Sequence, residues 1–176
     1  MKTHDRAKAA PEIGHASERL IEDRRVKDKT KTQAGTAVCE RCQAVGMHKH
    51  WFVDNALYES MAGNPLVRMV VCPGCKRIEK KVYEGEVLLD SPLLAENREM
   101  VYGTLYHAAA KAFLRNPLSR VALIEEEGEQ IRIVTTTCTL AERLGKAIQK
   151  AFKGKLKIKP SKDEKFVFVK WQRREN

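Results

Sequence analysis

Four cysteines in two identical spacings are the residues of this sequence best suited to chemistry. Cys39 and Cys42 form one Cys-x-x-Cys pair, and Cys72 and Cys75 form a second pair after 29 intervening residues. Each such pair folds into a tight knuckle that directs two sulfurs at one point, and two knuckles complete the tetrahedral thiolate shell that Zn²⁺ prefers. Four thiolates leave no open coordination position, so the sequence predicts a structural zinc site rather than a catalytic one.

Three other chemistries compete for these cysteines. Two disulfides suit a secreted chain, but this sequence begins with charged residues and without an apolar signal segment. A rubredoxin-type iron site usually has glycine after the second cysteine of each knuckle, where this chain has Gln43 and Lys76. A zinc deaminase requires Pro-Cys-x-x-Cys after a His-x-Glu, and here Val71 precedes the second pair. His48 and His50 lie between the pairs and are alternative ligands, although the four thiolates are the predicted set.

Apolar residues lead into each knuckle, which is the pattern of strands that feed a zinc site. We predict a zinc-ribbon-like module over residues 37–90, with strands before each pair and a further strand over residues 82–89 that leaves the second knuckle. A hairpin or loop must fill the long gap between the pairs. Because so small a module needs large side chains for its core, three aromatic residues are expected to cover the site: Trp51, Phe52 and Tyr58.

Residues 91–176 contain alternating helix and strand patterns. A helix over 91–115 begins with Ser91 as its cap and Pro92 as its first residue, and ends at Asn116-Pro117. Two strands follow on either side of an acidic turn, Glu126 to Glu129. The periodicity then predicts a helix over 140–152, with Thr139 and Glu142 as a capping box and Gly154 at its C-terminal end.

A basic hairpin ends the chain, with a first strand over 155–159, a turn over 160–164 and an apolar strand over 165–171. The order after residue 90 is therefore αββαββ. We predict an α+β protein in which the zinc-ribbon-like module precedes a basic α+β domain with a mostly antiparallel four-stranded sheet and two helices on one face. One face of the last strand is expected to pack on the helices, and its other face to meet the zinc module or offer aromatic rings to bases.

Positive charge is concentrated near the end of the chain. The net charge is +10, and residues 143–176 alone hold twelve basic and three acidic residues. Such asymmetry suggests a polyanion partner, with RNA or DNA as the first candidate, although a solvated basic surface is the simpler alternative. The helix and the following strand are expected to place their basic residues on one continuous edge. The residues predicted to bind nucleic acid are Arg143, Lys146, Lys150, Lys153, Lys155, Lys157, Lys159, Arg173 and Arg174.

The remaining features favour a cytoplasmic protein that is not an enzyme. Residues 1–36 carry mixed charge without periodicity and are predicted to be a flexible charged tail. No apolar run approaches the ~20 residues of a membrane span, and the odd Cys138 indicates a reducing compartment. We find no serine–histidine–aspartate set, phosphate-binding glycine loop or paired carboxylates, so neither an enzymatic function nor a small-molecule substrate is expected.

Several short motifs, distributed over residues 36–173, resemble those of a known family. They are Cys72-Pro-Gly-Cys-Lys-Arg-Ile, Gly85-Glu-Val, Asn116-Pro-Leu-Ser-Arg, Thr135-Thr-Thr, Leu140-Ala-Glu-Arg-Leu-Gly, Phe152-Lys-Gly-Lys-Leu and Val169-Lys-Trp. The run is similar to small bacterial zinc-ribbon proteins and to the zinc-binding region of the ribosomal large-subunit nuclear-export adaptor and its archaeal relatives. The resemblance implies that the four paired cysteines bind Zn²⁺ and that the basic domain faces ribosomal RNA or a ribosomal protein.

The sequence therefore predicts a zinc-binding, non-enzymatic protein that binds structured RNA, with the ribosome or a ribosomal subunit as its expected partner. Two alternatives stay open. One is a protein–protein adaptor that uses the zinc module, and the other is a rubredoxin-like electron carrier.

Overall fold

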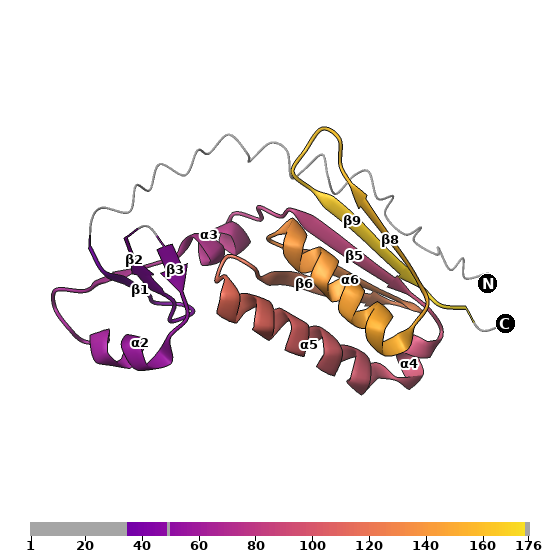
Figure 1. The fold of residues 1–176 in the computed structure, drawn as a ribbon, viewed down its shortest axis with the longest axis horizontal. Coiled ribbons are helices and arrows are strands. Elements are labelled where there is room, and N and C mark those ends of the chain that lie inside the picture. Colours follow the sequence, from indigo (N-terminus) through magenta and orange to yellow (C-terminus); the bar gives the residue numbers. More distant parts are fainter. Residues whose placement is uncertain (1–34, 49, 175–176) are drawn as a thin grey trace, which may run out of the picture.

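The chain forms an α+β fold with two separate sheets. The computed structural model describes residues 35–48 and 50–174, which contain five helices and nine strands. The two sheets lie toward opposite ends of the molecule, and helix α3 (Pro73–Glu79) lies between them (Figure 1). Apart from residues 35 and 36, the charged tail predicted over residues 1–36 lies outside the described residues. Of the helices that the structure describes, none is long and apolar enough to cross a bilayer.

The smaller sheet holds both cysteine pairs at its strand ends. We call residues 37–79 the cysteine module. Its elements besides α3 are β1 (Ala37–Cys39), β2 (Val45–Met47), β3 (His50–Phe52), α2 (Asn55–Met61) and β4 (Arg68–Val70). The strand order is β3-β2-β1-β4, with β1 parallel to β4 and antiparallel to β2. The gap between the cysteine pairs is thus filled by the β2–β3 hairpin, α2 and β4.

The larger sheet has five strands in the order β6-β7-β5-β9-β8. The strands are β5 (Gly85–Asp90), β6 (Val121–Glu127), β7 (Gln130–Thr135), β8 (Lys155–Pro160) and β9 (Val167–Gln172). The pair β5–β9 is parallel and the other three pairs are antiparallel. The helices are α4 (Leu93–Glu96), α5 (Arg98–Arg115) and α6 (Cys138–Phe152).

The sheet differs from the predicted one because it gains a strand from the region before residue 91. The strand expected over 82–89 is present as β5, but it lies at the centre of the five-stranded sheet, and the cysteine module does not contain it. Its burial explains the difference. Val87 and Leu89 are fully buried on one face, and Glu86 and Asp90 are nearly buried on the other. The strand that was expected to leave the second knuckle within the zinc-ribbon-like module therefore pairs within the larger sheet.

Helix α6 covers one face of the larger sheet and forms the core with it. Leu140, Leu144 and Ile148 are fully buried against β5 and β9, and Trp171 donates its indole N–H to the Lys153 carbonyl at 2.6 Å. The helix lies unusually close to β9 at Gly145, where a Cβ would come 2.4 Å from Val169 Cγ1. Helix α5 packs beside α6, so the prediction of helical packing on one face of the last strand is confirmed.

Two helix starts differ from the sequence prediction. The helix expected over 91–115 is interrupted at Asn97, whose side-chain amide donates to the Leu93 carbonyl at 3.0 Å and separates α4 from α5. Helix α6 is capped by Thr137, two residues before the predicted Thr139, because the Thr137 side chain accepts from the Leu140 N–H. The predicted ends are closer, since α5 ends at Arg115 with Asn116 as its C-cap, and α6 ends at Phe152 with Lys153, next to Gly154, as its C-cap.

Candidate metal centre and basic surfaces

The first knuckle follows directly from the buried strand β1. The Cys39 N–H donates to the Ala44 carbonyl at 2.8 Å, and the Gln43 N–H donates to the Cys39 carbonyl at 3.0 Å, which closes a turn around Cys42. Gln43 has a φ of 61°, a left-handed conformation that glycine adopts without strain and other residues adopt rarely. This knuckle therefore has the backbone shape for which rubredoxins use glycine, although it carries glutamine.

The second knuckle is built on the start of α3. Cys72 precedes the helix, Pro73 occupies its first turn, and the Cys75 N–H donates to the Cys72 sulfur at 3.4 Å. Gly74 is required here by close packing, because a Cβ at this position would lie 2.4 Å from the Pro117 carbonyl oxygen. Proline at the first helical position and glycine under a neighbouring backbone thus explain this Cys-Pro-Gly-Cys sequence.

The four sulfur atoms lie close enough together to bind a single metal ion. The Cys42 and Cys72 sulfurs are 3.5 Å apart, those of Cys39 and Cys75 are 3.9 Å apart, and all four lie within 4.8 Å of one another. A regular tetrahedron with Zn–S bonds of ~2.3 Å has sulfur–sulfur edges of about 3.8 Å. The donor set also receives a backbone hydrogen bond, from the Cys72 N–H to the Cys39 sulfur at 3.3 Å. The predicted ligand set is therefore brought together with the spacing of a four-coordinate site.

The pKa values of the thiols reflect the short distances between the four sulfur atoms. The hydrogen bond with Cys72 lowers the pKa of the half-buried Cys42 thiol to about 4. The same contact raises the pKa of Cys72 well above its ordinary range, and burial together with Cys42 raises the pKa of Cys75 to about 11. One thiolate thus forms easily, while each further negative charge beside it is disfavoured. A bound dication supplies the positive charge that allows all four sulfurs to ionise together.

The surroundings of the cluster are apolar. Trp51, Val71 and the buried Ala44 pack against the four cysteines, whereas Phe52 and Tyr58, which were predicted to cover the site with Trp51, are outside this cluster. Gly46 pairs with Trp51 across the β2–β3 hairpin, and its missing side chain leaves room for the indole ring. His48 and His50 are exposed and outside the metal-ligand cluster that the described residues form.

Comparisons of the chain with protein-family models, with characterised proteins and with solved structures find no match. The chemistry of this site is therefore inferred from its own residues. Among the described residues, the four cysteines form the one group of three or more potential ligands whose donor atoms converge on a point.

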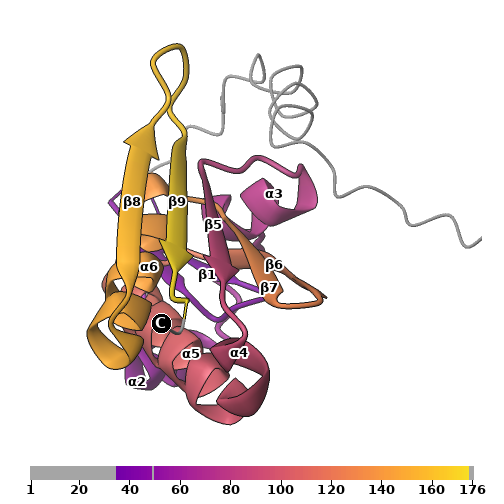
Figure 2. The same ribbon diagram turned by 90° about the vertical axis from the view of Figure 1, so that its right-hand side faces the viewer.

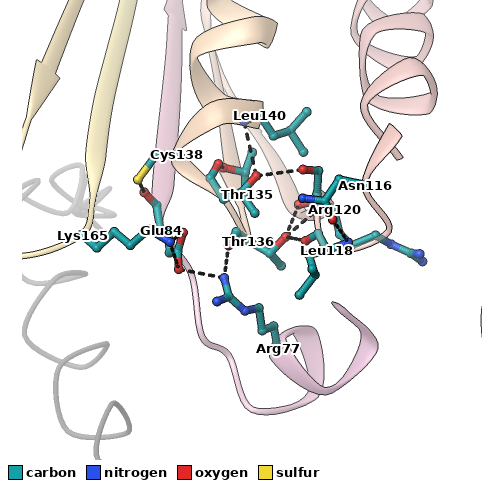
Figure 3. Close-up of polar contacts among 12 residues, drawn as sticks. Arg77, Glu84, Asn116, Leu118, Arg120, Thr135, Thr136, Cys138, Leu140 and Lys165 are labelled. Carbon is teal, nitrogen blue, oxygen red and sulfur yellow. Dashed lines mark hydrogen bonds and ion pairs between the residues drawn. The ribbon is translucent and has the colours of Figure 1, made fainter. Parts of the chain in front are cut away.

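A buried ion pair connects the second knuckle to the larger sheet (Figure 3). The Arg77 guanidinium on α3 donates to the Glu84 carboxylate and to the Thr136 carbonyl, each at 2.8 Å. Glu84 is only 7% exposed and also pairs with Lys165, and its backbone carbonyl accepts from the Cys138 thiol. The sequence gives no sign of this link beyond an arginine two residues after a cysteine ligand. Cys138 lies half-buried at the start of α6.

The structure divides the predicted basic residues between two faces. On α6, the exposed Arg143, Lys146 and Lys150 point away from the sheet, opposite the buried Leu140 and Leu144 face. On β8, exposed lysines alternate with core residues that pack beneath α6, and these lysines therefore project from the opposite face of the sheet. The expected single edge does not form, because the helix lies on top of the strand that follows it. The lysines of this β8 group are Lys155, Lys157 and Lys159.

Some of the predicted basic residues make contacts within the protein. Lys146 pairs with Glu142 at 3.2 Å, and Arg174 pairs with Asp90 at 3.3 Å. Arg173 donates to the Phe152 carbonyl at 2.7 Å, and together with Lys150 it lines a shallow groove of about 970 Å³ between α5 and α6. These residues retain exposed charge, but part of it is already balanced by neighbouring groups.

Proposed function

We propose that the four cysteines hold one structural Zn²⁺ and that the protein is a non-enzymatic RNA-binding protein. The spacing of the sulfur atoms, with contacts of 3.5 and 3.9 Å, is the observation that carries the metal assignment. Zinc is favoured over iron because Gln43 and Lys76 occupy the positions where rubredoxins usually have glycine. Four thiolates fill the coordination shell, which favours a role in holding the two knuckles together over a role in a reaction.

RNA is the proposed partner because the positive charge is unevenly distributed. Twelve of the basic residues lie in the last 34 positions, and most of those that the structure describes in this stretch are exposed. Clustered lysine and arginine side chains neutralise phosphates and release counterions, which supplies most of the affinity of non-specific nucleic-acid binding. The resemblance of the short sequence motifs to those of ribosome-associated zinc proteins makes a ribosomal subunit in the cytoplasm the first partner to test.

The metal assignment is tested by elemental analysis of freshly purified, reduced protein. We expect one zinc per chain and no visible absorption band, because zinc thiolates are colourless whereas ferric thiolates are red. Cys75→Ser should lose the metal, since it removes one of the four ligands. Cys138→Ser is the matched control and should keep it, because this cysteine lies outside the cluster. Iron in the wild-type protein, or no metal at all, would contradict the assignment.

The RNA assignment is tested by sedimenting the tagged protein with purified ribosomal subunits over a range of salt concentrations. We expect association at low salt that weakens steeply as salt rises, because phosphate contacts release counterions. Nuclease treatment should abolish capture of the protein by subunits or free RNA. Association that survives both nuclease and high salt would exclude RNA as the partner.

A protein–protein adaptor is the second candidate, and one observation favours it. The cysteine module exposes two large apolar side chains at its edge, Met69 on the edge strand β4 (54% exposed) and Leu66 in the turn before this strand (88% exposed). Exposed apolar residues on a sheet edge are typical of surfaces that pair with another chain. Substituting Met69→Lys should then remove a protein partner from a nuclease-treated pull-down, whereas RNA binding should be unaffected.

A further inference from the structure

The face of the larger sheet opposite α6 carries a group of side chains that the function above does not explain. In the β8–β9 register, Lys157 lies opposite Lys170, and Lys159 lies opposite Phe168. Residues opposed in an antiparallel pair share a face. Because Leu156 and Ile158 alternate with the lysines and pack into the core, this face is the one turned away from α6. Figure 2 shows β8, β9 and β5 side by side in front of α6. We call Lys155, Lys157, Lys159, Phe168 and Lys170 the β8–β9 face.

The lysines of β8 differ from Lys170 in their ion pairing. In the described part of the chain, no carboxylate lies within ion-pair distance of Lys155, Lys157 or Lys159. Lys170 reaches Asp90 at 3.8 Å, but Asp90 also accepts hydrogen bonds from Gln172 and Arg174. Three of the four lysines of the β8–β9 face therefore present charge that no described carboxylate balances.

The cross-strand pair of Lys157 and Lys170 is unfavourable in the isolated protein. Like charges that face each other across an antiparallel pair are destabilising. A bound phosphate between the two ammonium groups would reverse the sign of this interaction. Lysines on an edge strand can simply prevent aggregation, but that role does not require two lysines opposite each other. An anion-binding surface accounts for the pair.

An aromatic ring lies among these charges. Phe168 is half-buried, its ring centroid is 4.7 Å from that of the buried Phe166, and in register it lies between Lys159 on β8 and Glu86 on β5. Proteins that bind single-stranded RNA on a sheet stack unpaired bases on aromatic side chains and place the phosphates against basic ones. The bases of an A-form duplex are stacked on one another and are not accessible to a ring in this position.

We propose that the β8–β9 face binds a single-stranded segment of RNA, with a base stacked on Phe168 and phosphates at Lys157, Lys159 and Lys170. This inference rests on the proposed function and names the surface and the form of RNA that it recognises. The lysines of α6 lie on the other side of the sheet and are not part of this site. They provide an internal comparison for the experiment.

The experiment measures fluorescence anisotropy of a labelled 12-nucleotide oligouridylate and of a 12-base-pair RNA duplex, in both cases with zinc-loaded full-length protein. Lys157→Gln/Lys159→Gln should weaken oligouridylate binding about tenfold and reduce the salt slope by about 1.4, since each single-strand phosphate contact contributes ~0.7. Arg143→Gln/Lys150→Gln removes the same charge from α6, where nucleic-acid contacts were also predicted from the sequence, and should lose less affinity than the β8 variant because it leaves the β8–β9 face intact.

The stacking step is tested by Phe168→Leu, which should weaken oligouridylate binding about tenfold and leave the salt slope unchanged. Phe168→Tyr keeps the ring and should bind like the wild type, which separates lost stacking from disturbed packing. The inference fails if Phe168→Leu binds as tightly as the wild type, if the duplex is preferred, or if the α6 variant alone loses affinity. In these cases RNA binding itself stands. If the wild-type protein binds neither probe, the proposed function fails as well.

Discussion

At the residue scale, the two cysteine knuckles reach similar shapes through different residues. The second knuckle uses proline at the helix start and a glycine beneath the Pro117 carbonyl. The first has neither of these, and Gln43 adopts its left-handed backbone conformation with a side chain present. A strained φ at this position is maintained by the hydrogen bonds from Cys39 and Gln43 that close the turn, and by the metal that the turn is proposed to bind.

The strain at Gln43 gives a prediction about the first knuckle. Gln43→Gly should leave stability unchanged or raise it by up to about 1 kcal/mol, because glycine adopts a positive φ without a steric penalty. Gln43→Val should lower it by about 1–2 kcal/mol, because a β-branched side chain is least compatible with this conformation. Thermal unfolding of the zinc-loaded variants measures both. Equal melting temperatures for the glycine and valine variants would show that the knuckle backbone differs from the one described.

At the element scale, helix α6 is capped by a different threonine from the one that its sequence predicts. The run Thr135-Thr136-Thr137-Cys138-Thr139 offers several hydroxyls before an apolar periodic segment, and Thr139 with Glu142 fits a capping box. The structure uses Thr137 instead. Thr135, the last residue of β7, and Thr136 are buried, and their hydroxyls donate to the backbone carbonyls of Gly85 and Leu118. The helix can therefore begin as soon as β7 ends.

The two threonines form a matched pair for mutation. Thr137→Ala should destabilise the protein by about 1 kcal/mol, because it removes the hydrogen bond to the Leu140 N–H. Thr139→Ala should change stability by less than about 0.5 kcal/mol, since this exposed residue lies inside the first turn and alanine is a better helix former. Urea denaturation followed by circular dichroism gives both values. A larger loss for Thr139→Ala would restore the capping box predicted from the sequence.

For the other elements, prediction succeeded where residues close in sequence determine the structure and failed where distant segments determine it. Features set by neighbours in sequence were predictable: both cysteine pairs, the end of α5 at Asn116, and the alternation of lysine with Leu156 and Ile158 on β8. Features set by distant segments were not. The pairing of β5 between β7 and β9 depends on partner residues at least 40 positions away, and the side of the sheet on which α6 lies depends on its packing over Gly145.

The same division applies to the candidate site. The ligand set could be named from spacing alone, because the geometry of a Cys-x-x-Cys knuckle is local. The grouping of the basic residues could not be predicted, because the short connection through Gly154 does not determine on which face of the sheet each side chain lies. Arg77 was missed for a related reason, since its partners Glu84 and Thr136 belong to the loop before β5 and to the segment after β7.

At the scale of the whole molecule, the chain contains two parts with very different cores. The larger sheet with α4, α5 and α6 contains fifteen buried hydrophobic residues in one cluster. The cluster around the proposed metal site contains four buried residues, and three of them are cysteine ligands. A domain with so small a core usually depends on its metal for folding, and binding of structural zinc contributes about 10–16 kcal/mol in zinc-finger peptides. The link from Arg77 to Glu84 and Thr136 is the main polar connection that the structure shows between the parts.

This difference predicts how the protein responds to loss of zinc. A strong chelator should abolish hydrogen-exchange protection over β1, β2 and α3, because the cysteine module cannot bury enough apolar surface without its metal. Protection in β5, β7 and β9 should persist, since these strands lie in the centre of a sheet with its own core. Exchange measured by mass spectrometry on the same sample, before and after chelation and after zinc is restored, follows both parts at once.

Arg77→Met shows whether the two parts stabilise each other through the buried ion pair. It leaves the Glu84 carboxylate paired with Lys165 but without the guanidinium, so the larger sheet should lose about 1–3 kcal/mol, while the zinc content should stay at one per chain. In this variant, chelation should not destabilise the larger sheet further, because the Arg77 contact that connects it to the cysteine module is already absent. Loss of protection in β5 and β9 upon chelation of the wild type, to the same extent as in β1, would instead show that the metal supports the entire described fold.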